Sequence, residues 1–485
     1  MSGAPAAPRT DAPRTEPSRA LPDGTVVRLA RRTRVADGGA VLVGGAPTRV
    51  TRLKPGARGL LRGRRIEVRD AASRALAAHL IEAGLADPDP RTLPAADPRE
   101  VTVVVPAYGR SRQLGRLLDS VRADLGDVRI IVVDDGSAPA DASAVGAAAA
   151  RHDAEVLTLP ENRGPADARN AGLRAVRTRF VLFVDTDAVL RPGTVGLLLR
   201  HFADPALALV APRISGLEAG RPSWVLRYES DRSSLDHGED GALVRPHSPM
   251  AWVSTTCVLA RVEALGAGFG AGMRVAEDVD LVWRLVEAGW RVRYEPAAVA
   301  AHEHRGTVRS WLTRKFVYGT GAATLARRHG GLAAPAVLAP WTAGVLLALS
   351  AQRRWSVPVA IAISSLAAAR IARRLPEMGR PTALATRLTA YGVASAAAQG
   401  SALAVRHWWP AFAVAALFSR RVRRIVAVSA VADAVVEYAR LRPRLDPVRF
   451  AVARRLDDLA YGAGVWWGAL RARSPRALAP VIRSR

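Results

Sequence analysis

Uninterrupted apolar runs alternate with amphipathic segments through the middle of the chain. Residues 101–108, with a proline near the end, and residues 128–133 predict two buried strands, and residues 114–125 between them predict a helix. A third apolar run, residues 179–184, predicts another fully buried strand. Because strands that alternate with helices are typical of βαβ units, we expect an α/β fold with a parallel sheet and right-handed crossovers.

Two of these strands end in pairs of acidic residues. Asp134 and Asp135 follow the second strand, and Asp185 and Asp187 follow the third. The carboxyl ends of parallel strands meet at one edge of a sheet, where open α/β folds bind ligands. Paired acids at the end of a buried strand call for a cation, and a divalent ion that bridges to a nucleotide diphosphate is the natural partner. The alternative is a loop in which the aspartates form local turns.

Two further segments carry candidate chemistry. Residues 162–172 form a turn containing glycine and proline that opens a helix, and its Arg163 and Arg169 suit a diphosphate near a helix N-terminus. The acid pair at 277–278 precedes an amphipathic helix expected at 281–288. A positioned carboxylate can remove a proton from a hydroxyl, although acids at this place also complement a helix dipole.

Five motifs occur in order between residues 99 and 328, about half of the chain. They are VVVPAYGR, VVDDGS, NRGPADARNAGL, FVDTD and AEDVDLVWRLVEAGW. In this order and spacing they resemble the family 2 glycosyltransferases, which have a Rossmann-like GT-A fold. The resemblance implies a nucleotide-sugar donor, Mg²⁺ or Mn²⁺ as cofactor, and inversion at the anomeric carbon. Uracil and guanine are both compatible with the donor motifs.

The resemblance also implies roles for residues at matching positions. The donor-binding residues are Pro106, Tyr108, Asp134, Asp135, Arg163, Arg169 and Asp185, of which the first four lie near uracil and ribose. Asp185 and Asp187 hold the metal and the diphosphate. His302, which comes after a strand expected at 290–294, completes the metal shell, with His304 as the alternative. Asp278 is the expected base, with Glu277 assisting it. A purely hydrogen-bonding role competes with metal binding for the histidines.

Composition narrows the function further. The formal net charge is +27, and Cys257 is the single cysteine, so the chain forms no disulfide framework and suits a reducing cytoplasm. Residues 1–20 are rich in Pro, Ala, Arg and Ser, lack the apolar core of a secretory signal and are expected to be disordered. Because the arginines punctuate apolar stretches rather than form one basic face, we do not expect nucleic-acid binding.

The C-terminal region, 329–440, is rich in alanine and arginine and contains charge-free stretches. These are residues 330–352, 355–369, 388–405 and 407–419. Their lengths, with arginine clusters and tryptophans at their ends, indicate contact with a membrane, although Pro335 and Pro340 interrupt the first. The alternative is a soluble Ala-rich helical domain. Residues 441–485 have an amphipathic pattern, which suits either a membrane interface or packing against the catalytic domain.

The segment before the motifs, residues 21–98, predicts a small separate module. Its short apolar pieces are separated by glycine and aspartate turns, and a helix is expected at 71–83. This order resembles the winged-helix-like PqqD-type domains, which bind precursor peptides in ribosomal natural-product pathways. The alternative is a small capping subdomain of the enzyme.

The whole arrangement resembles the glycosyltransferase family of mycofactocin biosynthesis in actinobacteria. That resemblance implies glucose transfer from UDP-glucose to the peptide-derived redox cofactor mycofactocin or its precursor, and extension of a β-1,4-glucan. It also places the catalytic domain in the cytoplasm, at the inner face of the cell membrane.

Two other functions stay open. A membrane-associated transferase would act on a lipid or polysaccharide, but the Gln-x-x-Arg-Trp motif common in polymerising synthases is reduced here to residues 309–311. A non-catalytic peptide-binding scaffold is the alternative of another class, and the intact Asp135, Asp185, Asp187 and Asp278 argue against it.

Overall fold

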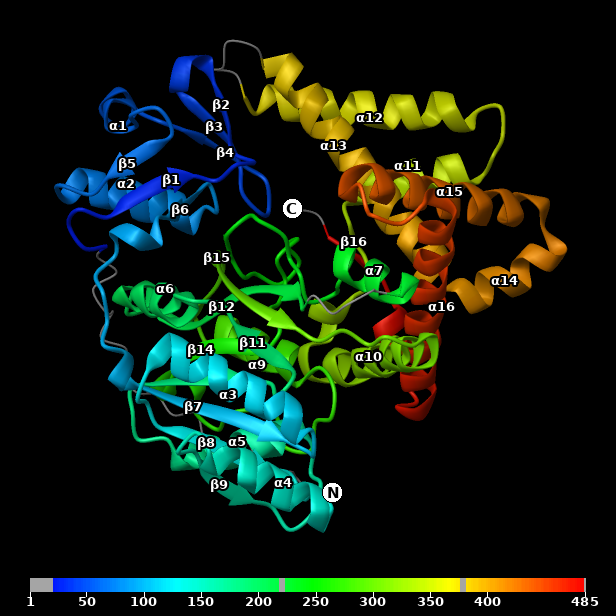
Figure 1. Cartoon of the computed structure of the whole chain (residues 1–485). Coiled ribbons are helices and arrows are strands. Elements are labelled where there is room, and N and C mark those ends of the chain that lie inside the picture. The colour runs from blue at the N-terminus through cyan, green and yellow to red at the C-terminus, as the bar shows by residue number, and fades with distance from the viewer. Residues whose placement is uncertain (1–20, 218–222, 376–380, 484–485) are drawn as a thin grey trace, which may run out of the picture.

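The computed structural model describes residues 21–217, 223–375 and 381–483. The tail that we expect to be disordered, residues 1–20, lies outside these ranges. Figure 1 shows an N-terminal module in blue, a central sheet flanked by helices in cyan and green, and a group of C-terminal helices in yellow to red. The chain therefore runs from this module through the central sheet to the C-terminal helices.

The N-terminal module contains the short strands and the helix that the pattern predicts. Its elements are β1 (Val26–Leu29), β2 (Arg34–Ala36), β3 (Val41–Gly44), β4 (Arg49–Arg52), α1 (Pro55–Leu60), β5 (Arg65–Glu67), α2 (Ala71–Glu82) and β6 (Ala86–Pro88). They form two three-stranded sheets, β5-β1-β6 and β2-β3-β4. Val27, Ile66 and Leu80 are fully buried between the sheets and α2. Peptide binding by this module stays a prediction.

The module is attached to the catalytic domain by ion pairs. Arg293 Nη1 donates to Asp87 Oδ1 over 2.8 Å, and Arg245 Nη2 lies 2.8 Å from Glu82 Oε1. Leu243 packs against the core of the module. Because both partners of the Arg293–Asp87 pair are largely shielded from solvent, this contact resists screening by salt.

The central sheet has nine strands in the order β11-β15-β12-β14-β10-β7-β8-β9, with β13 paired to β15. Its strands are β7 (Val101–Ala107), β8 (Ile130–Asp134), β9 (Glu155–Thr158), β10 (Phe180–Val184), β11 (Ala188–Leu190), β12 (Leu207–Gly216), β13 (Ala242–Leu243), β14 (Cys257–Arg261) and β15 (Arg291–His302). The run β10-β7-β8-β9 is parallel, as predicted. The other half is mixed, because β14 lies antiparallel to both β10 and β12, which the sequence pattern did not predict.

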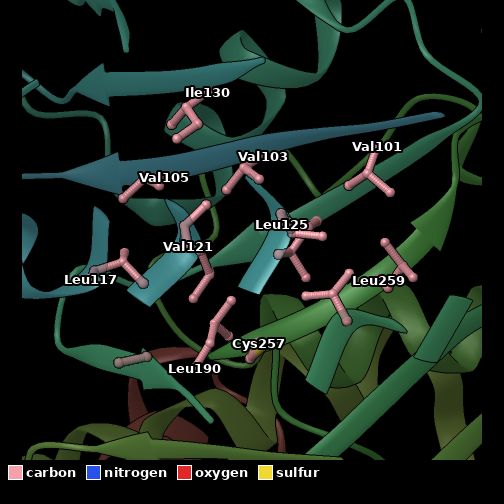
Figure 2. Close-up of a cluster of buried hydrophobic side chains, with 14 of the residues drawn as sticks. Val101, Val103, Val105, Leu117, Val121, Leu125, Ile130, Leu190, Cys257 and Leu259 are labelled. Carbon is pink, nitrogen blue, oxygen red and sulfur yellow. The ribbon is translucent and has the colours of Figure 1, made fainter. Parts of the chain in front are cut away.

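Helices cover both faces of this sheet. They are α3 (Ser111–Leu125), α4 (Pro139–Ala150), α5 (Pro165–Ala175), α6 (Thr194–Arg200), α7 (Trp224–Asp231), α8 (Val262–Leu265), α9 (Glu277–Glu287) and α10 (Val308–His329). Figure 2 shows Val101, Val103 and Val105 of β7 turned towards Leu117 and Val121 of α3. Val104 lies between Val103 and Val105 in β7, and its side chain belongs to a second buried cluster, together with residues of α5 and α9. Burial on both faces explains why these strands read as continuous apolar runs.

Two predicted boundaries near the site need correction. Helix α9 begins at Glu277 rather than at Leu281, so the acid pair lies in its first turn and not before the helix. Strand β15 continues to His302, whereas the sequence predicted a strand only over 290–294. The strand is prolonged because it pairs along its length with β12 and, at its end, with β11.

The C-terminal region is largely helical, with helices of 10 to 25 residues. It contains β16 (Val337–Leu338), α11 (Pro340–Ser350), α12 (Ser356–Arg373), α13 (Pro381–Ala402), α14 (Trp409–Phe418), α15 (Arg420–Leu441), α16 (Pro447–Arg471) and β17 (Val481–Ile482). The charge-free stretch 330–352 is not one helix, since proline cannot continue a helix and α11 starts only at Pro340. Among the described residues, α12 alone has the length and apolarity to cross a bilayer, with 17% of its residues buried.

Helix α16 packs against the catalytic domain, which is the second of the two roles predicted for it. Its Gly464 lies against the backbone of Phe316 in α10, and a Cβ atom at Gly464 would overlap with that carbonyl oxygen. Gly319 of α10 lies equally close to the backbone of Tyr461. Lys315 of α10 lies 3.0 Å from Glu229 of α7 and 3.6 Å from Asp457 of α16. Helix α10 is thus held between the catalytic sheet and the C-terminal helices.

Candidate active site

The carboxyl ends of three parallel strands bring the predicted donor residues to one edge of the sheet. Ala107 at the end of β7 pairs with Asp134 at the end of β8. Tyr108 follows directly after β7 and is 58% exposed, which is unusual for a large aromatic residue beside a buried strand. Asp185 and Asp187 follow β10, the neighbour of β7 on its other side. Pro106 lies within β7, two residues before Tyr108.

Asp134 and Asp135 organise the backbone on the β8 side of this edge. The Asp135 carboxylate accepts the backbone N–H groups of Arg163 and Gly164, each over 2.8 Å. Burial nevertheless raises its pKa. Asp134 accepts the backbone N–H of Ser137 over 3.2 Å. The two acids therefore fix the turn after β8 and the loop before α5, and Arg163 contributes its backbone to this arrangement.

Arg169 connects the two acid pairs. Its Nη2 donates to Asp185 Oδ1 over 2.6 Å and its Nη1 donates to Glu277 Oε1 over 3.0 Å. The residue is only 2% exposed, and burial alone would lower the pKa of its guanidinium, but the two carboxylates raise it instead. Burial raises the pKa of Asp185 despite the arginine. With both terminal nitrogens occupied by carboxylates, Arg169 bridges the strand end and the helix start.

Asp187 lies between a histidine and an arginine. His302 Nε2 is 3.3 Å from Oδ1, and Arg110 Nη1 donates to Oδ2 over 2.7 Å. Burial alone would raise the pKa of Asp187, but the His302 ring and Arg110 hold it well below its usual range. Among the described residues His304 forms no ion pair with the aspartate, and its ring centre lies 5.6 Å from that of His302. Of the two candidate histidines, the structure thus places His302 against the acid.

The residues present fit a divalent cation only in part. Within residues 21–217, 223–375 and 381–483, no three His, Cys, Asp or Glu side chains are gathered as a complete ligand set. Asp187 and His302 form an adjacent carboxylate–imidazole pair, and Asp185 lies two positions before Asp187 in the chain. Mg²⁺ is commonly bound through one or two carboxylates, with phosphate oxygens and water filling the remaining positions. The pair therefore suits a metal that arrives together with a diphosphate.

Three arginines lie around Asp187, and the sequence predicted only that the basic segment from Arg305 lies over the donor diphosphate or along a membrane surface. Arg110, at φ 58°, precedes α3, Arg305 follows the end of β15, and Arg314 lies on α10 with its guanidinium 4.8 Å from the Tyr318 ring centre. Burial and then the charges of Arg110 and Arg314 lower the pKa of Arg305. Crowded cations of this kind suit a polyanionic ligand such as a diphosphate. The signal was available, since Arg110 closes the first motif and the segment from Arg305 is basic.

Asp278 has the environment of a proton acceptor. Burial, and then the neighbouring charge of Glu277, raise its pKa to about 7. Its Oδ1 accepts the N–H of Val279 over 2.8 Å. A carboxylate with this pKa is partly ionised at neutral pH and binds a proton more strongly than an ordinary aspartate, as general-base catalysis requires.

Asp280, two residues further along α9, plays a structural part that the sequence did not indicate. It is fully buried, and its carboxylate accepts hydrogen bonds from Nε of Arg328 over 2.6 Å and from Nε2 of His329 over 2.9 Å. These contacts bind the first turn of α9 to the end of α10. The acid pair at 277–278 and helix α10, which carries Arg314, are therefore held in fixed positions relative to each other.

Comparison with known proteins agrees with this geometry. The family described as Glycosyl transferase family 2 matches residues 102–268. The Pre-mycofactocin glycosyltransferase of Mycobacterium tuberculosis is 44% identical over 476 residues, which cover 96% of this chain and 99% of the relative. The succinoglycan biosynthesis protein ExoO of Rhizobium meliloti is 29% identical over 207 residues, which cover 41% of this chain and 59% of that protein.

Solved structures give a weaker likeness. The mannosyltransferase PcManGT from Pyrobaculum calidifontis in complex with GDP-Man and Mn²⁺ has a TM-score of 0.38 and 22% identity, covering 63% of this chain and 90% of that one. The identity along almost the whole length of a curated relative, together with the matched domain and the GT-A arrangement of acids at the sheet edge, settles the family. The chain belongs to glycosyl transferase family 2 and is a glycosyltransferase.

Proposed function

We propose that the enzyme transfers glucose from UDP-glucose to the peptide-derived redox cofactor mycofactocin or its precursor, with inversion at the anomeric carbon, and extends a β-1,4-linked glucan. The observation that carries the proposal is the 44% identity to the Pre-mycofactocin glycosyltransferase along 99% of that relative. The acceptor, the sugar and the linkage rest on this similarity. The reaction type rests on the site.

The donor binds at the edge formed by β7, β8 and β10. Tyr108 is exposed and free to contact the base, and Asp134 and Asp135 hold the turn and loop beside it. Arg110, Arg305 and Arg314 face the diphosphate with positive charge. Asp185, Asp187 and His302 are the residues that would hold Mg²⁺ or Mn²⁺. When bound, the metal supplies positive charge against the leaving diphosphate.

Sugar transfer proceeds by a single displacement. The acceptor hydroxyl oxygen forms a bond to the anomeric carbon from the face opposite the diphosphate. The bond from that carbon to the diphosphate oxygen breaks, and its electron pair leaves with UDP. Asp278 takes the hydroxyl proton, and its pKa near 7 allows it to release that proton to water afterwards. Glu277, held by Arg169, keeps the helix start in place beside the donor.

Mass spectrometry of the purified full-length chain tests the proposal. The reaction contains UDP-glucose, Mg²⁺ or Mn²⁺, and a reduced mycofactocin precursor, and the expected result is a series of precursor masses separated by one hexose. Asp278→Asn should abolish the series. Asp127→Asn is the matched control, because Asp127 is a fully exposed carboxylate remote from this edge and should leave the products unchanged.

Three outcomes separate the parts of the proposal. GDP-glucose in place of UDP-glucose should give no product, and equal use of both would overturn the assignment of the base. Metal-dependent UDP release without modified precursor would keep the transferase and reject the acceptor, and lipid extracts would then be tried as acceptors. Neither UDP release nor product, from a folded protein, would contradict the proposal as a whole.

A further inference from the structure

Helix α14 is an apolar element without a cover. Its ten residues carry no charge, and none of them is buried. Leu417 and Phe418 at its end are 74% and 85% exposed. In Figure 1 the helix projects from the outer edge of the C-terminal helices. A charge-free helix with no buried residue is not explained by the packing of this chain, because solvent-exposed helices normally have a polar face.

Helix α15, which follows directly and contacts α14, also carries exposed apolar side chains. Val428, Val431 and Val435 recur at helical spacing, and each is at least 60% exposed. One residue, Ser419, separates α14 from α15, and the two helices are in contact. We use the name α14–α15 face for the exposed side chains of Val414, Leu417, Phe418, Val428, Val431 and Val435.

The charges around this face have one sign. Arg420, Arg421, Arg423 and Arg424 occupy the first turns of α15, between the apolar side chains of α14 and those of α15. Arg423 donates to the Ala416 carbonyl over 2.8 Å, and the other three form no ion pair with any acid of the described ranges. From residue 330 to 432 the sequence contains a single acidic residue, Glu377.

The acids of α15 itself are turned inward. Asp433 Oδ2 lies 3.1 Å from Arg454 Nε of α16. Glu437 Oε1 lies 3.3 Å from Arg232 Nε at the end of α7. Neither acid therefore offsets the arginines of the α14–α15 face. The face presents exposed apolar side chains beside arginines that no acid in the described part of the chain neutralises. This combination is complementary to a partner with anionic groups at its surface and an apolar layer beneath them.

We propose that the α14–α15 face docks on the surface of an anionic lipid bilayer. Leu417 and Phe418 enter the outer part of the hydrocarbon, and the arginines contact lipid phosphates. Helix α14 lies at the interface rather than crossing it, since ten residues reach only about 15 Å and a bilayer core is about 30 Å thick. The inference is independent of the identity of the acceptor.

The base of α14 is fixed to the body of the enzyme. Trp408 Nε1 donates to the Leu478 carbonyl over 2.8 Å, and Trp409 Nε1 donates to the Leu459 carbonyl over 3.1 Å. These tryptophans, which the sequence predicts at a membrane interface, are therefore hydrogen-bonded to the C-terminal part of the chain. Docking through Leu417 and Phe418 would hold the catalytic domain in one orientation relative to the bilayer.

Flotation of the full-length protein with lipid vesicles tests this proposal. One set of vesicles contains equal parts of phosphatidylglycerol and phosphatidylcholine, and the other contains phosphatidylcholine alone. We expect binding to the anionic vesicles that falls with added salt. Replacing Arg420, Arg421 and Arg424 together by Gln should weaken it about 100-fold, from roughly fivefold for each arginine. The double variant Leu417→Asp, Phe418→Asp should lose binding.

A matched control removes the same charge elsewhere. The control variant replaces by Gln three exposed arginines on strands of the N-terminal module, Arg34, Arg49 and Arg65. It should bind vesicles within about twofold of the unmodified protein. All variants should release UDP from the donor at the unmodified rate, which shows that they are folded. Equal binding to both kinds of vesicle, or equal loss in the control, would overturn the proposal. The proposal would also be overturned if the protein bound no vesicles and instead formed a dimer in solution that the double variant Leu417→Asp, Phe418→Asp dissociates.

Discussion

The end of strand β10 and the first turn of α9 both carry acid pairs, but the fold shifts the pKa of one carboxylate in each pair, Asp187 and Asp278, in opposite directions. At the strand end, His302 and Arg110 keep the pKa of Asp187 below its usual range, so it stays ionised. In the helix turn, burial and the charge of Glu277 raise the pKa of Asp278 to about 7. Carboxylates whose environments separate their pKa values have different chemical tasks. The first suits permanent charge and cation binding, and the second suits proton transfer.

The largest expected effect comes from neutralising the permanently charged acid. Asp187→Asn should lower sugar transfer by roughly 10⁴-fold, because the positive charge that the metal places against the leaving diphosphate amounts to several kcal/mol. Steady-state kinetics with UDP-glucose measures the loss. Circular dichroism should show an unchanged fold, and turnover at the unmodified rate would refute the metal assignment.

Removing the proton acceptor should cost less. Asp278→Asn should lower kcat by about 10³-fold, within the range typical of general-base catalysis. Because Asp278 is not among the donor-binding residues, the affinity for UDP should remain. If the variant loses UDP binding and keeps its kcat, Asp278 belongs to the donor site and the comparison of the two pairs fails.

The two histidines beside Asp187 allow a sharper test of the metal site. His302→Ala should weaken Mn²⁺ binding in the presence of UDP by about 10- to 100-fold. His304→Ala should change it by no more than about twofold, since only His302 of the two lies within ion-pair distance of the aspartate in the described residues. Calorimetric titration of Mn²⁺ measures both affinities, and a larger effect at His304 would exchange the two roles.

The smallest effect is the pH dependence of the unmodified enzyme. Asp278 must be deprotonated to accept a proton, so kcat/KM should rise about tenfold per pH unit below pH 7 and level off above it. Asp187 remains ionised throughout this range and should add no inflection there. A profile that is flat between pH 5.5 and 8.5, or that falls as pH rises through about 7, would contradict the assignment of the base.

Local pattern predicted the strands and the strand-end acids because each depends on a short run of neighbours. The apolar run before Asp185 predicts a fully buried strand, and the structure confirms it. Contacts between distant residues were out of reach: the Arg169 bridge to Glu277 spans more than a hundred positions, and only the fold brings them together. The same holds for Gly319 against the backbone of Tyr461. The antiparallel insertion of β14 has no periodic signal that separates it from a parallel strand.

The most direct test of the two-acid account is a calorimetric titration of UDP with Mn²⁺ into Asp187→Asn and Asp278→Asn, paired with single-turnover sugar transfer by each variant. The account predicts that Asp187→Asn loses metal-dependent UDP binding, whereas Asp278→Asn binds UDP normally and fails only at transfer. Equal loss of UDP binding in both variants, or normal binding in Asp187→Asn, would contradict it.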